Sequence, residues 1–333
     1  AKDLELHPDG RIIVLGEFAR GVSNSDVYLF SINSDGVLQD SVIVGLSKNG
    51  IETDEHVNSV TVISNGFIVT GSTTKVETND VRDIRDAMHL RFDNSLNEIP
   101  QAGPITWGPR NYGFNSDDVA VKVVEVATNN FYVFGFSNRI YPPYNGDYNF
   151  WIYSLSGTGV PLNADLYTGK TSEDEELKSV ELSPVQSGPG YILSGTATRP
   201  TGETQSYLVK LSETLSFAST DILVETNPTD MGNTVGGNVT TNSLLSQEFM
   251  LLTNDRTSSD QNVNLALTKL TRELTKAWQV PLLFGGISDD FAGSVKELPD
   301  GRILVVGTMT VGGLNGQRKM VLMKLNAAGK LTK

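Results

Sequence analysis

The feature that most constrains this chain is a short apolar segment that recurs six times. Five copies carry a glycine at their fifth or sixth position, and Thr253 takes its place in the remaining copy. Self-similarity at a fixed spacing is typical of architectures in which each unit buries its apolar faces against its neighbours. We expect the repeated glycine to permit a close approach between neighbouring units, or a kink. The six segments are 11–18, 67–74, 131–138, 191–198, 249–256 and 303–310.

A second recurring segment follows each of these, and it ends in an apolar residue and then a small polar residue. The polar residues are Asn33, Asp93, Ser156, Ser212, Thr271 and Asn326. Short connections such as "PDG" at 8–10 and "NSDG" at 33–36 separate the segments, and such clusters between β-rich runs indicate hairpins. No segment keeps an apolar period of 3.6 residues over the length of a helix. Each unit is therefore predicted to be a meander of four antiparallel strands.

Four-stranded sheets that are repeated and closed in a ring make a β-propeller. We predict an all-β fold, a six-bladed β-propeller of four-stranded antiparallel blades, with 1–333 as one domain. The register places residues 1–8 on the innermost strand of the first blade and leaves the last blade one strand short. Such an exposed edge calls for a cover, which a neighbouring chain can supply. The predicted blades are approximately 1–50, 51–110, 111–170, 171–229, 230–286 and 287–333.

Composition excludes several classes of function. The formal net charge of −13 disfavours nucleic acid, because proteins that bind a phosphate backbone need a basic stripe. The chain has no cysteine, so disulfides, thiolate nucleophiles and thiolate zinc sites are ruled out. No apolar run approaches the roughly 20 residues of a transmembrane helix, and the first residues do not form a signal peptide. We expect a mature chain without a transmembrane segment.

The repeat resembles a known group of bacterial propeller repeats. An acidic "DD" lead-in, a "DG" turn, an apolar run that ends in glycine, and a "KLN" strand occur in order within residues 278–331, and again in part within 1–44. This pattern is similar to the SBBP-type and delta-60-type repeat families. The resemblance implies an extracytoplasmic bacterial protein in the periplasm or at the cell surface, often a lipoprotein. It implies no specific activity, because the repeat defines a scaffold.

Acidic residues stand just before the innermost strand of most predicted blades. A feature that repeats in five connections is better explained by a role in the fold than by a role in catalysis. Short acidic side chains there can accept hydrogen bonds from backbone amides of the connecting turns. We also expect them to make one rim of the central channel negative. A bound ion and a glycosidase-like carboxylate pair stay open as alternatives, although no metal site or cofactor is predicted. These residues are Asp54, Glu55, Asp117, Asp118, Asp174, Glu175, Asp230, Asp289 and Asp290.

The candidate binding face carries the long loops. In a four-stranded meander, the loop between strands two and three and the connection to the next blade emerge on the same side, and loops on a rigid scaffold are where binding is usually found. An aromatic patch on the third blade is the sharpest candidate, because tyrosine couples apolar area to a hydroxyl. Alternatively, these rings pack on each other and stiffen a long loop. The candidate residues are Arg82, Arg85, Tyr112, Phe114, Tyr141, Tyr144 and Tyr148.

Two functions from different classes follow. The favoured one is a noncatalytic binding or scaffolding module outside the cytoplasm that presents its long-loop face to a protein or glycan partner. The alternative is a carbohydrate-active or other hydrolytic propeller that uses Asp and Glu on the channel rim. His7, His56 and His89 occupy unrelated repeat positions and are interpreted as turn or strand residues. No motif of a metalloprotease, serine hydrolase or phosphate-binding loop is present, so no catalytic residue is assigned.

Overall fold

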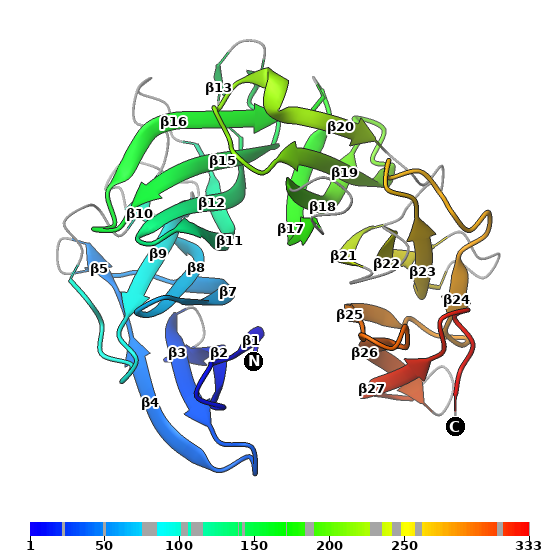
Figure 1. The fold of residues 1–333 in the computed structure, drawn as a ribbon, viewed down its shortest axis with the longest axis horizontal. Coiled ribbons are helices and arrows are strands. Elements are labelled where there is room, and N and C mark those ends of the chain that lie inside the picture. The colour runs from blue at the N-terminus through cyan, green and yellow to red at the C-terminus, as the bar shows by residue number, and fades with distance from the viewer. Residues whose placement is uncertain are drawn as a thin grey trace. The chain divides into compact units, whose positions relative to one another are not determined.

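The computed structural model is built from antiparallel sheets (Figure 1). The chain forms two compact units, Ala1–Tyr167 and Thr168–Lys333. Among the described residues, the regular elements are strands apart from one turn of 3-10 helix at Ser219–Asp221. The structure describes residues 1–21, 24–48, 51–74, 85–100, 106–107, 116–138, 140–141, 144–170, 172–183, 190–226, 235–241, 248–256, 262–311 and 316–332.

The first unit contains three four-stranded sheets in which neighbouring strands are antiparallel. Sheet 1 consists of β1 (Asp3–Leu6), β2 (Ile12–Ala19), β3 (Ser25–Ile32) and β4 (Leu38–Val44). Sheet 2 consists of β7 (Glu55–Ile63), β8 (Gly66–Thr74), β9 (Arg85–Phe92) and β10 (Thr106–Trp107). Sheet 3 consists of β11 (Asp118–Ala127), β12 (Asn130–Ser137), β15 (Asn149–Ser156) and β16 (Pro161–Thr168). Two short hairpins join β5 (Ser47–Lys48) to β6 (Ile51–Glu52) and β13 (Ile140–Tyr141) to β14 (Tyr144–Asn145).

The second unit continues the same meander. Sheet 4 consists of β17 (Asp174–Ser183), β18 (Gly190–Thr198), β19 (Thr204–Ser212) and β20 (Ile222–Thr226). Sheet 5 consists of β21 (Val235–Thr241), β22 (Phe249–Asp255), β23 (Asn264–Leu270) and β24 (Leu282–Phe284). Sheet 6 has three strands among the described residues, β25 (Phe291–Glu297), β26 (Ile303–Val311) and β27 (Gln317–Leu325). Both ends of the chain therefore agree with the predicted register: β1 belongs to the first sheet, and the sixth sheet has three strands among the described residues.

The repeated glycine faces a β-bulge in the first strand of its own sheet. A Cβ atom added to Gly71 would lie 2.0 Å from the carbonyl oxygen of His56, opposite a register shift in β7. The same addition at Gly135 would lie 2.0 Å from the carbonyl oxygen of Val119 on β11. Any side chain there would displace the bulged strand. The close approach thus occurs within one sheet at these two positions. At Gly307, by contrast, an added Cβ atom would also lie 2.7 Å from the side chain of Leu265 in the neighbouring sheet 5, which is the approach between neighbouring units that the sequence predicts.

The small polar residue after each third strand organises the hairpin that follows. The Oδ1 atom of Asn33 accepts hydrogen bonds from the backbone N–H groups of Asp35 and Val37, at 3.0 and 2.9 Å. Asp93 and Asn326 accept equivalent pairs of bonds. Such Asx turns compete with strand pairing and reverse the chain. Three positions further on the backbone has a positive φ, at Gly36, Leu96, Gly159, Leu274 and Gly329.

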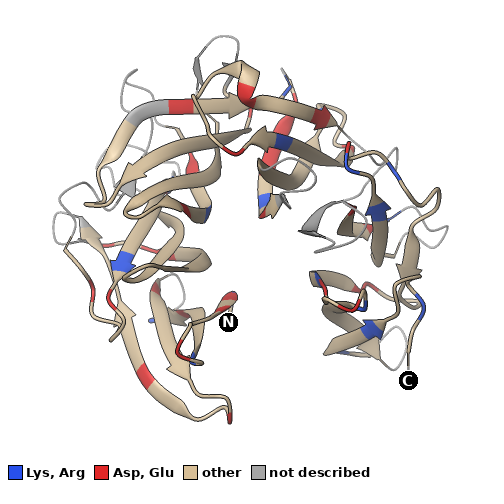
Figure 2. Cartoon of the chain, in the orientation of Figure 1, with Lys and Arg blue, Asp and Glu red and all other residues tan. Residues whose placement is uncertain are grey.

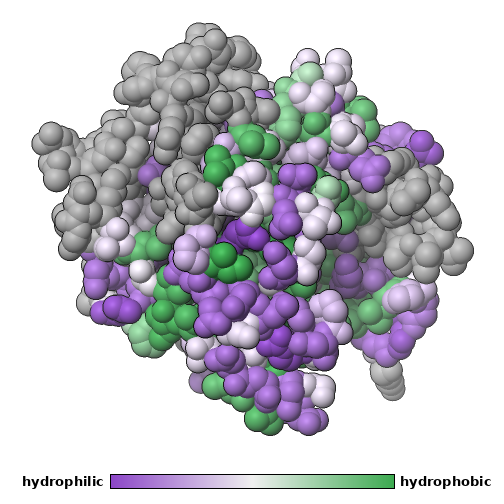
Figure 3. All heavy atoms as spheres, turned by 60° about the vertical axis from the view of Figure 1, so that its left-hand side comes forward, coloured by the Kyte–Doolittle hydropathy of each residue, from purple (hydrophilic) through white to green (hydrophobic). Residues whose placement is uncertain are grey.

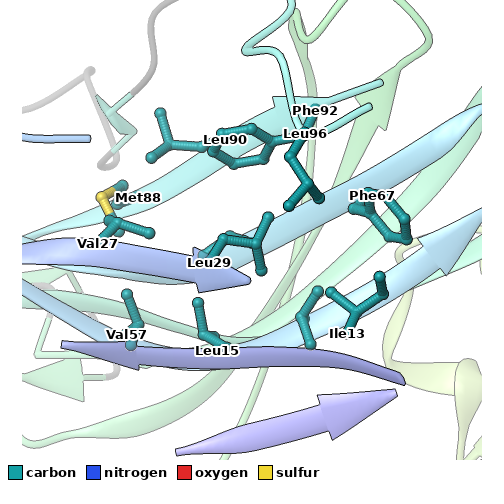
Figure 4. Close-up of a cluster of buried hydrophobic side chains, with 12 residues drawn as sticks. Ile13, Leu15, Val27, Leu29, Val57, Phe67, Met88, Leu90, Phe92 and Leu96 are labelled. Carbon is teal, nitrogen blue, oxygen red and sulfur yellow. The ribbon is translucent and has the colours of Figure 1, made fainter. Parts of the chain in front are cut away.

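Apolar side chains from adjacent sheets of one unit interlock. Figure 4 shows the cluster between sheets 1 and 2, where Leu15 and Leu29 point toward Val57, Met88 and their neighbours. These four named side chains are at most 1% exposed. Burial of each such side chain contributes about 1.5–3 kcal/mol. The third strand of a sheet therefore has to be apolar on both faces when a sheet lies on either side of it.

Candidate functional site

The acidic pairs fall into two classes that point to opposite sides of the strand. The first carboxylate of a pair accepts a hydrogen bond from the N–H that begins the third strand of the preceding sheet. Asp54 accepts from Ser25 at 2.8 Å and Asp289 accepts from Val263 at 3.0 Å. Asp117 accepts from the backbone of Arg85 at 2.9 Å. Each of these carboxylates therefore fastens one sheet to the next.

The second carboxylate accepts from the turn that leads into its own strand. Glu55 accepts from the N–H of Leu46 at 3.2 Å, Glu175 from that of Lys170 at 3.1 Å, and Asp290 from that of Gly286 at 2.7 Å. Asp290 also accepts from the N–H of Thr310 at 2.7 Å. These contacts are of the kind that the structural interpretation of the acidic pairs requires. Asp174 begins β17 and lies opposite Thr198.

The second carboxylates are buried, which changes the expected electrostatics. Glu55, Asp118 and Glu175 are 0% exposed, and Asp290 is 1% exposed. A buried carboxyl contributes little to a solvent-exposed potential, so the expectation of a negative rim is corrected for these four residues. Burial raises the pKa of Glu175 to about 8 and raises that of Glu55. The red segments along the strands in Figure 2 therefore include groups that solvent does not reach.

Two of the candidate binding residues meet at Asp117. The guanidinium of Arg85 donates from Nε to Oδ1 at 2.9 Å and from Nη2 to Oδ2 at 2.6 Å. The hydroxyl of Tyr148 donates to the same Oδ2. Arg85 begins β9, Asp117 precedes β11 and Tyr148 precedes β15, so the network joins the starts of three strands from sheets 2 and 3. We call Arg85, Asp117 and Tyr148 the Asp117 network.

The Asp117 network holds its members in defined charge states. Burial pushes the pKa of Asp117 upward, but the hydrogen bonds from Arg85 and Tyr148 and the charge of Arg85 outweigh it and leave the pKa lowered. Hydrogen bonding to Asp117 raises the pKa of Arg85. Burial and the neighbouring Asp117 raise the pKa of Tyr148. At neutral pH the network is a carboxylate, a guanidinium and a neutral phenol. Bidentate pairs of this kind are geometrically specific.

Asp118 lies on the other side of the same strand and is fully buried. Its Oδ2 accepts from the hydroxyl of Ser116 at 2.7 Å. Burial raises its pKa to about 7. Across the sheet it stands in a row with Ser137 and Asn149, which are also buried. The result is that two adjacent aspartates have pKa values displaced in opposite directions.

Sequence reasoning missed the aromatic pair next to this row. Trp151 and Tyr153 of β15 are fully buried and stack with ring centroids 4.5 Å apart. They pack with Ile68 and Ala87 of sheet 2. The charge of Asp118 contributes to a raised pKa of Tyr153, after burial as the main cause. The run "FWIYSL" signals a strand buried on both faces, but it does not reveal which sheet each ring faces.

Several candidates lie outside what the structure describes. Arg82, Tyr112, Phe114 and Asp230 are not among the described residues. For Tyr141 and Tyr144 only the backbone is described, as members of β13 and β14, where they are paired with each other. Of the aromatic patch, the structure therefore places one side chain, Tyr148. Its ring makes an edge contact with Phe136 at 5.6 Å between centroids.

The three histidines are engaged locally. His7 lies in the first hairpin, 2.8 Å from a carboxylate oxygen of Asp9, and His56 of β7 lies 3.3 Å from Asp54. His89 is fully buried on β9, and burial lowers its pKa to about 4. It is therefore neutral at physiological pH. No cluster of three or more His, Asp or Glu side chains that could hold a metal ion occurs in the part of the chain that the structure describes.

Comparison with known proteins identifies repeats of a β-propeller type. The family model "Domain of unknown function (DUF5122) beta-propeller" matches residues 7–38 and 298–331. Both segments start at a "PDGR" turn and run through the second and third strands of sheets 1 and 6. No curated protein sequence is significantly similar to this chain. Among the described residues, no helix has the length and apolarity needed to cross a membrane.

Several solved structures are similar to this chain at low sequence identity. A protein of unknown function from Dyadobacter fermentans is 11% identical, with a TM-score of 0.59 over 97% of this chain and 93% of its own. An endo-arabinase from Bacteroides thetaiotaomicron is 8% identical, with a TM-score of 0.43 over 86% and 94%. A β-fructofuranosidase from Bombyx mori is 10% identical, with a TM-score of 0.44 over 99% and 62%. The first likeness supports the fold alone, and the other two carry no argument.

Proposed function

We propose that this protein is a noncatalytic binding module that acts outside the bacterial cytoplasm and presents its long-loop face to a protein or glycan partner. The observation that supports this proposal most directly is the Asp117 network. In it, residues at the starts of β9 and β15 donate hydrogen bonds to the carboxylate of Asp117, which directly precedes β11. Long segments enter all three strands, at 75–84, 108–117 and 138–148. Binding loops need rigid bases, because less entropy is then lost when a partner orders them.

The hydrogen bonds of the Asp117 network favour a role in supporting the long loops over a role in catalysis. Asp117 is engaged by two side chains and one backbone N–H, so its oxygens are committed to structural bonds. Asp118 is 0% exposed, and a general acid must reach its substrate. Tyr141 and Tyr144 lie in the same segment as Tyr148 but are paired in the separate β13–β14 hairpin. We assign contact with the partner to these two residues, and the support of the loop to Tyr148.

The test distinguishes residues that contact the partner from residues that only support the loop. The double variant Tyr141→Ala/Tyr144→Ala is expected to keep the wild-type melting temperature and to lose binding on a glycan array, or capture of a partner identified by mass spectrometry from a cell-envelope extract. Tyr132→Ala on β12 is the matched control and should retain binding. Unchanged binding by the double variant, or loss of binding that only follows a lowered melting temperature, would contradict the assignment.

The hydrolytic alternative rests on a specific observation. Carboxyl groups with pKa values displaced in opposite directions are a pattern seen in acid/base catalysis, and Asp117 and Asp118 have it. Their side chains point to opposite sides of β11, however, and Asp118 is buried. Hydrolysis of arabinan or of aryl glycosides that is abolished by Asp118→Asn would favour this alternative over the binding function.

We further propose that the six sheets are the blades of one closed six-bladed propeller. The support comes from Met320 and Leu322 of β27, which are 82% and 68% exposed. When sheets 3 and 6 are aligned on the repeated glycine, Phe150 and Ile152 of β15 take the positions of Met320 and Leu322. Phe150 and Ile152 are fully buried. In a closed ring every blade has a neighbour on both faces. Leu322→Ala should then lower the free energy of unfolding by about 2 kcal/mol or more. A change below about 0.5 kcal/mol, as for an exposed site, would contradict closure.

Localisation outside the cytoplasm, with or without a lipid anchor, is part of the proposal. It follows from the resemblance to SBBP-type and delta-60-type repeats and is compatible with a chain that lacks cysteine. Fractionation of cells that express the native gene, followed by detection in periplasmic, membrane and cytoplasmic fractions, tests it directly. Detection in the cytoplasmic fraction alone would refute it.

A further inference from the structure

The surface seen in Figure 3 mixes hydrophilic and hydrophobic side chains, whereas the interior between sheets 2 and 3 contains a distinct polar feature. Asp118 of β11, Ser137 of β12 and Asn149 of β15 are directly opposite one another across sheet 3. Opposite residues of neighbouring strands point to the same side, with Cβ atoms about 4.5–5.5 Å apart. All three are at most 1% exposed. We call Asp118, Ser137 and Asn149 the Asp118 row.

The Asp118 row lacks one hydrogen atom for complete hydrogen bonding. Oδ1 of Asp118, Oγ of Ser137 and Oδ1 of Asn149 have no hydrogen-bond partner among the described residues. The other polar atoms are engaged, because Oδ2 of Asp118 accepts from Ser116 at 2.7 Å and Nδ2 of Asn149 donates to the carbonyl of Asp147 at 2.8 Å. With Asp118 ionised, one hydroxyl hydrogen has to serve two acceptors. A proton on Asp118 completes the row, since Asp118 can then donate to Ser137 and Ser137 to Asn149.

The equivalent carboxylate of sheet 2 has its donors already. Glu55 is as completely buried as Asp118. Its Oε1 accepts from the hydroxyls of Thr53 at 2.5 Å and Thr73 at 3.0 Å, and its Oε2 accepts from the N–H of Leu46 at 3.2 Å. Both oxygens of Glu55 are therefore served without an added proton. The incomplete row is a property of sheet 3 and not of the repeat.

The charges nearest in the chain and on β9 disfavour an ionised Asp118. Burial raises its pKa to about 7, and the charges of Asp86 on β9 and of Asp117 act in the same direction. The two arginines of β9 are engaged elsewhere. Arg85 donates to Asp117, and Arg91 donates to a carbonyl of the β15–β16 hairpin.

The remaining elements around the row supply no compensating cation among the described residues. β8 contains no charged residue. His56 of β7 lies within 3.6 Å of two carboxylates, and His89 of β9 is neutral because burial lowers its pKa to about 4. On the side of β15 and β16, burial and the charges of Asp118 and Asp165 raise the pKa of Tyr153, so its phenol is neutral. An ionised Asp118 would therefore be a buried charge without a partner, which is strongly unfavourable.

The row lies where two long segments join sheet 3. Asp118 begins β11, directly after the segment 108–117. Ser137 ends β12 before the segment 138–148, and Asn149 begins β15 after it. The hydrogen bonds of the row therefore hold together the strand ends from which both segments leave the sheet.

We propose that the Asp118 row is a proton-dependent link between these strand ends. A proton on Asp118 joins the starts of β11 and β15 to the end of β12 through Ser137, and loss of the proton lets the strand ends separate locally. The base of the long-loop face is then held more firmly in acidic than in neutral or alkaline surroundings. The link is a property of sheet 3 and does not require that the long-loop face bind a partner.

The direction of the pH effect follows from proton binding. The closed link has a pKa of about 7 at Asp118, and a solvent-exposed aspartate has the ordinary value of 3.8, so the closed form binds the extra proton between these values. The equilibrium constant for local opening should therefore rise about tenfold per pH unit between about pH 5 and 7 and level off above.

Hydrogen exchange of the full chain between pH 5 and 8, corrected for intrinsic exchange rates, measures this opening. Peptides that cover residues 116–121 and 147–152 are expected to lose protection as the pH rises to about 7. Residues 288–293 are the reference, because Asp290 there accepts from two backbone N–H groups as a carboxylate. Protection of the reference should change much less.

The carboxyl ¹³C chemical shift of Asp118 reports the proton directly and should titrate with a midpoint near 7. Asp118→Asn puts a permanent donor in the row and should remove the pH dependence of exchange at both peptides. Asn149→Ala removes the last acceptor and should lower the midpoint by about 0.7 pH unit, the equivalent of one hydrogen bond. Asn130→Ala, an exposed residue at the other end of sheet 3, is the matched control and should leave the midpoint unchanged.

Three outcomes would overturn the proposal. The first is an Asp118 carboxyl that titrates near 4 in wild-type protein. The second is protection that falls equally at residues 288–293, because exchange would then report global unfolding. The third is an Asp118→Asn variant that keeps the pH dependence. If Asn149→Ala does not fold, the wild-type midpoint and Asp118→Asn decide. None of these measurements uses a partner, so the binding function is left to its own test.

Discussion

The connection into sheet 3 and the connection into sheet 6 carry the same two letters, Asp-Asp, yet they are satisfied differently. In sheet 6, Asp290 accepts hydrogen bonds from two backbone N–H groups, those of Gly286 and Thr310. In sheet 3, the equivalent Asp118 accepts from the Ser116 hydroxyl and stands in a row with the buried residues Ser137 and Asn149. The comparison teaches that one repeated carboxylate accepts two backbone hydrogen bonds in one sheet and is a buried group with a raised pKa in another.

The largest expected effect comes from matched substitutions of the two equivalent residues. Asp290→Asn leaves one oxygen to serve two backbone donors and turns an NH2 group toward the other, which should cost about 2 kcal/mol of unfolding free energy. Asp118→Asn removes a buried carboxylate and should leave stability at pH 7.5 unchanged or raise it. Urea unfolding of both variants at pH 7.5 measures the difference. Equal destabilisation would abolish the distinction between the two sheets.

A second prediction concerns pH. Asp118 has a pKa of about 7 in the folded chain against an ordinary value of 3.8, so between these values the folded state binds the extra proton. The free energy of unfolding should therefore fall as pH rises through this window, by about 1.4 kcal/mol per pH unit for one such group. Glu175, with a pKa of about 8, and Glu297, with about 7, act in the same direction.

Asp118→Asn should make the free energy of unfolding depend less steeply on pH, because the folded state then binds one extra proton fewer. Urea unfolding at several values between pH 4.5 and 7.5 measures this slope. Asp117→Asn is the control. The pKa of Asp117 is lowered, so its stabilisation is present above the ordinary value and is lost only as pH falls below it. Its slope between pH 5 and 7 should equal that of the wild type. A flattened slope in Asp117→Asn, or an unchanged one in Asp118→Asn, would reverse the assignment.

The smallest effect separates two tyrosines of one segment. Tyr148→Phe removes the hydroxyl that donates to Asp117 and should cost about 1 kcal/mol. The hydroxyl of Tyr153 is buried and has no hydrogen-bond partner among the described residues, so Tyr153→Phe should cost nothing or stabilise the chain slightly. Thermal unfolding at pH 7 compares the two. A loss for Tyr153→Phe as large as that for Tyr148→Phe would indicate that the buried hydroxyl is satisfied.

The local architecture could be predicted from the sequence because its causes are local. The spacing of Gly71 and Gly135 marked the second strands, and Asn33 and Asp93 marked the hairpins, since an Asx turn is formed by a side chain and its own neighbouring backbone. The antiparallel sheets and the three-stranded sixth sheet followed from the same register. The reason for the glycine was predicted only in part, because a bulge in an adjacent strand cannot be recognised from one strand's pattern.

The sequence by itself determined that adjacent carboxylates recur before the first strands and that their side chains point to opposite sides. Only the tertiary structure decided what each of them meets. Arg85 and Tyr148 are 63 residues apart, and they converge on Asp117 because β9, β11 and β15 begin at neighbouring positions of two packed sheets. Asp118, one residue on, meets the buried interior of the same pair of sheets. Charge state depends on non-local neighbours and on burial, and neither is encoded in the spacing of residues along one strand.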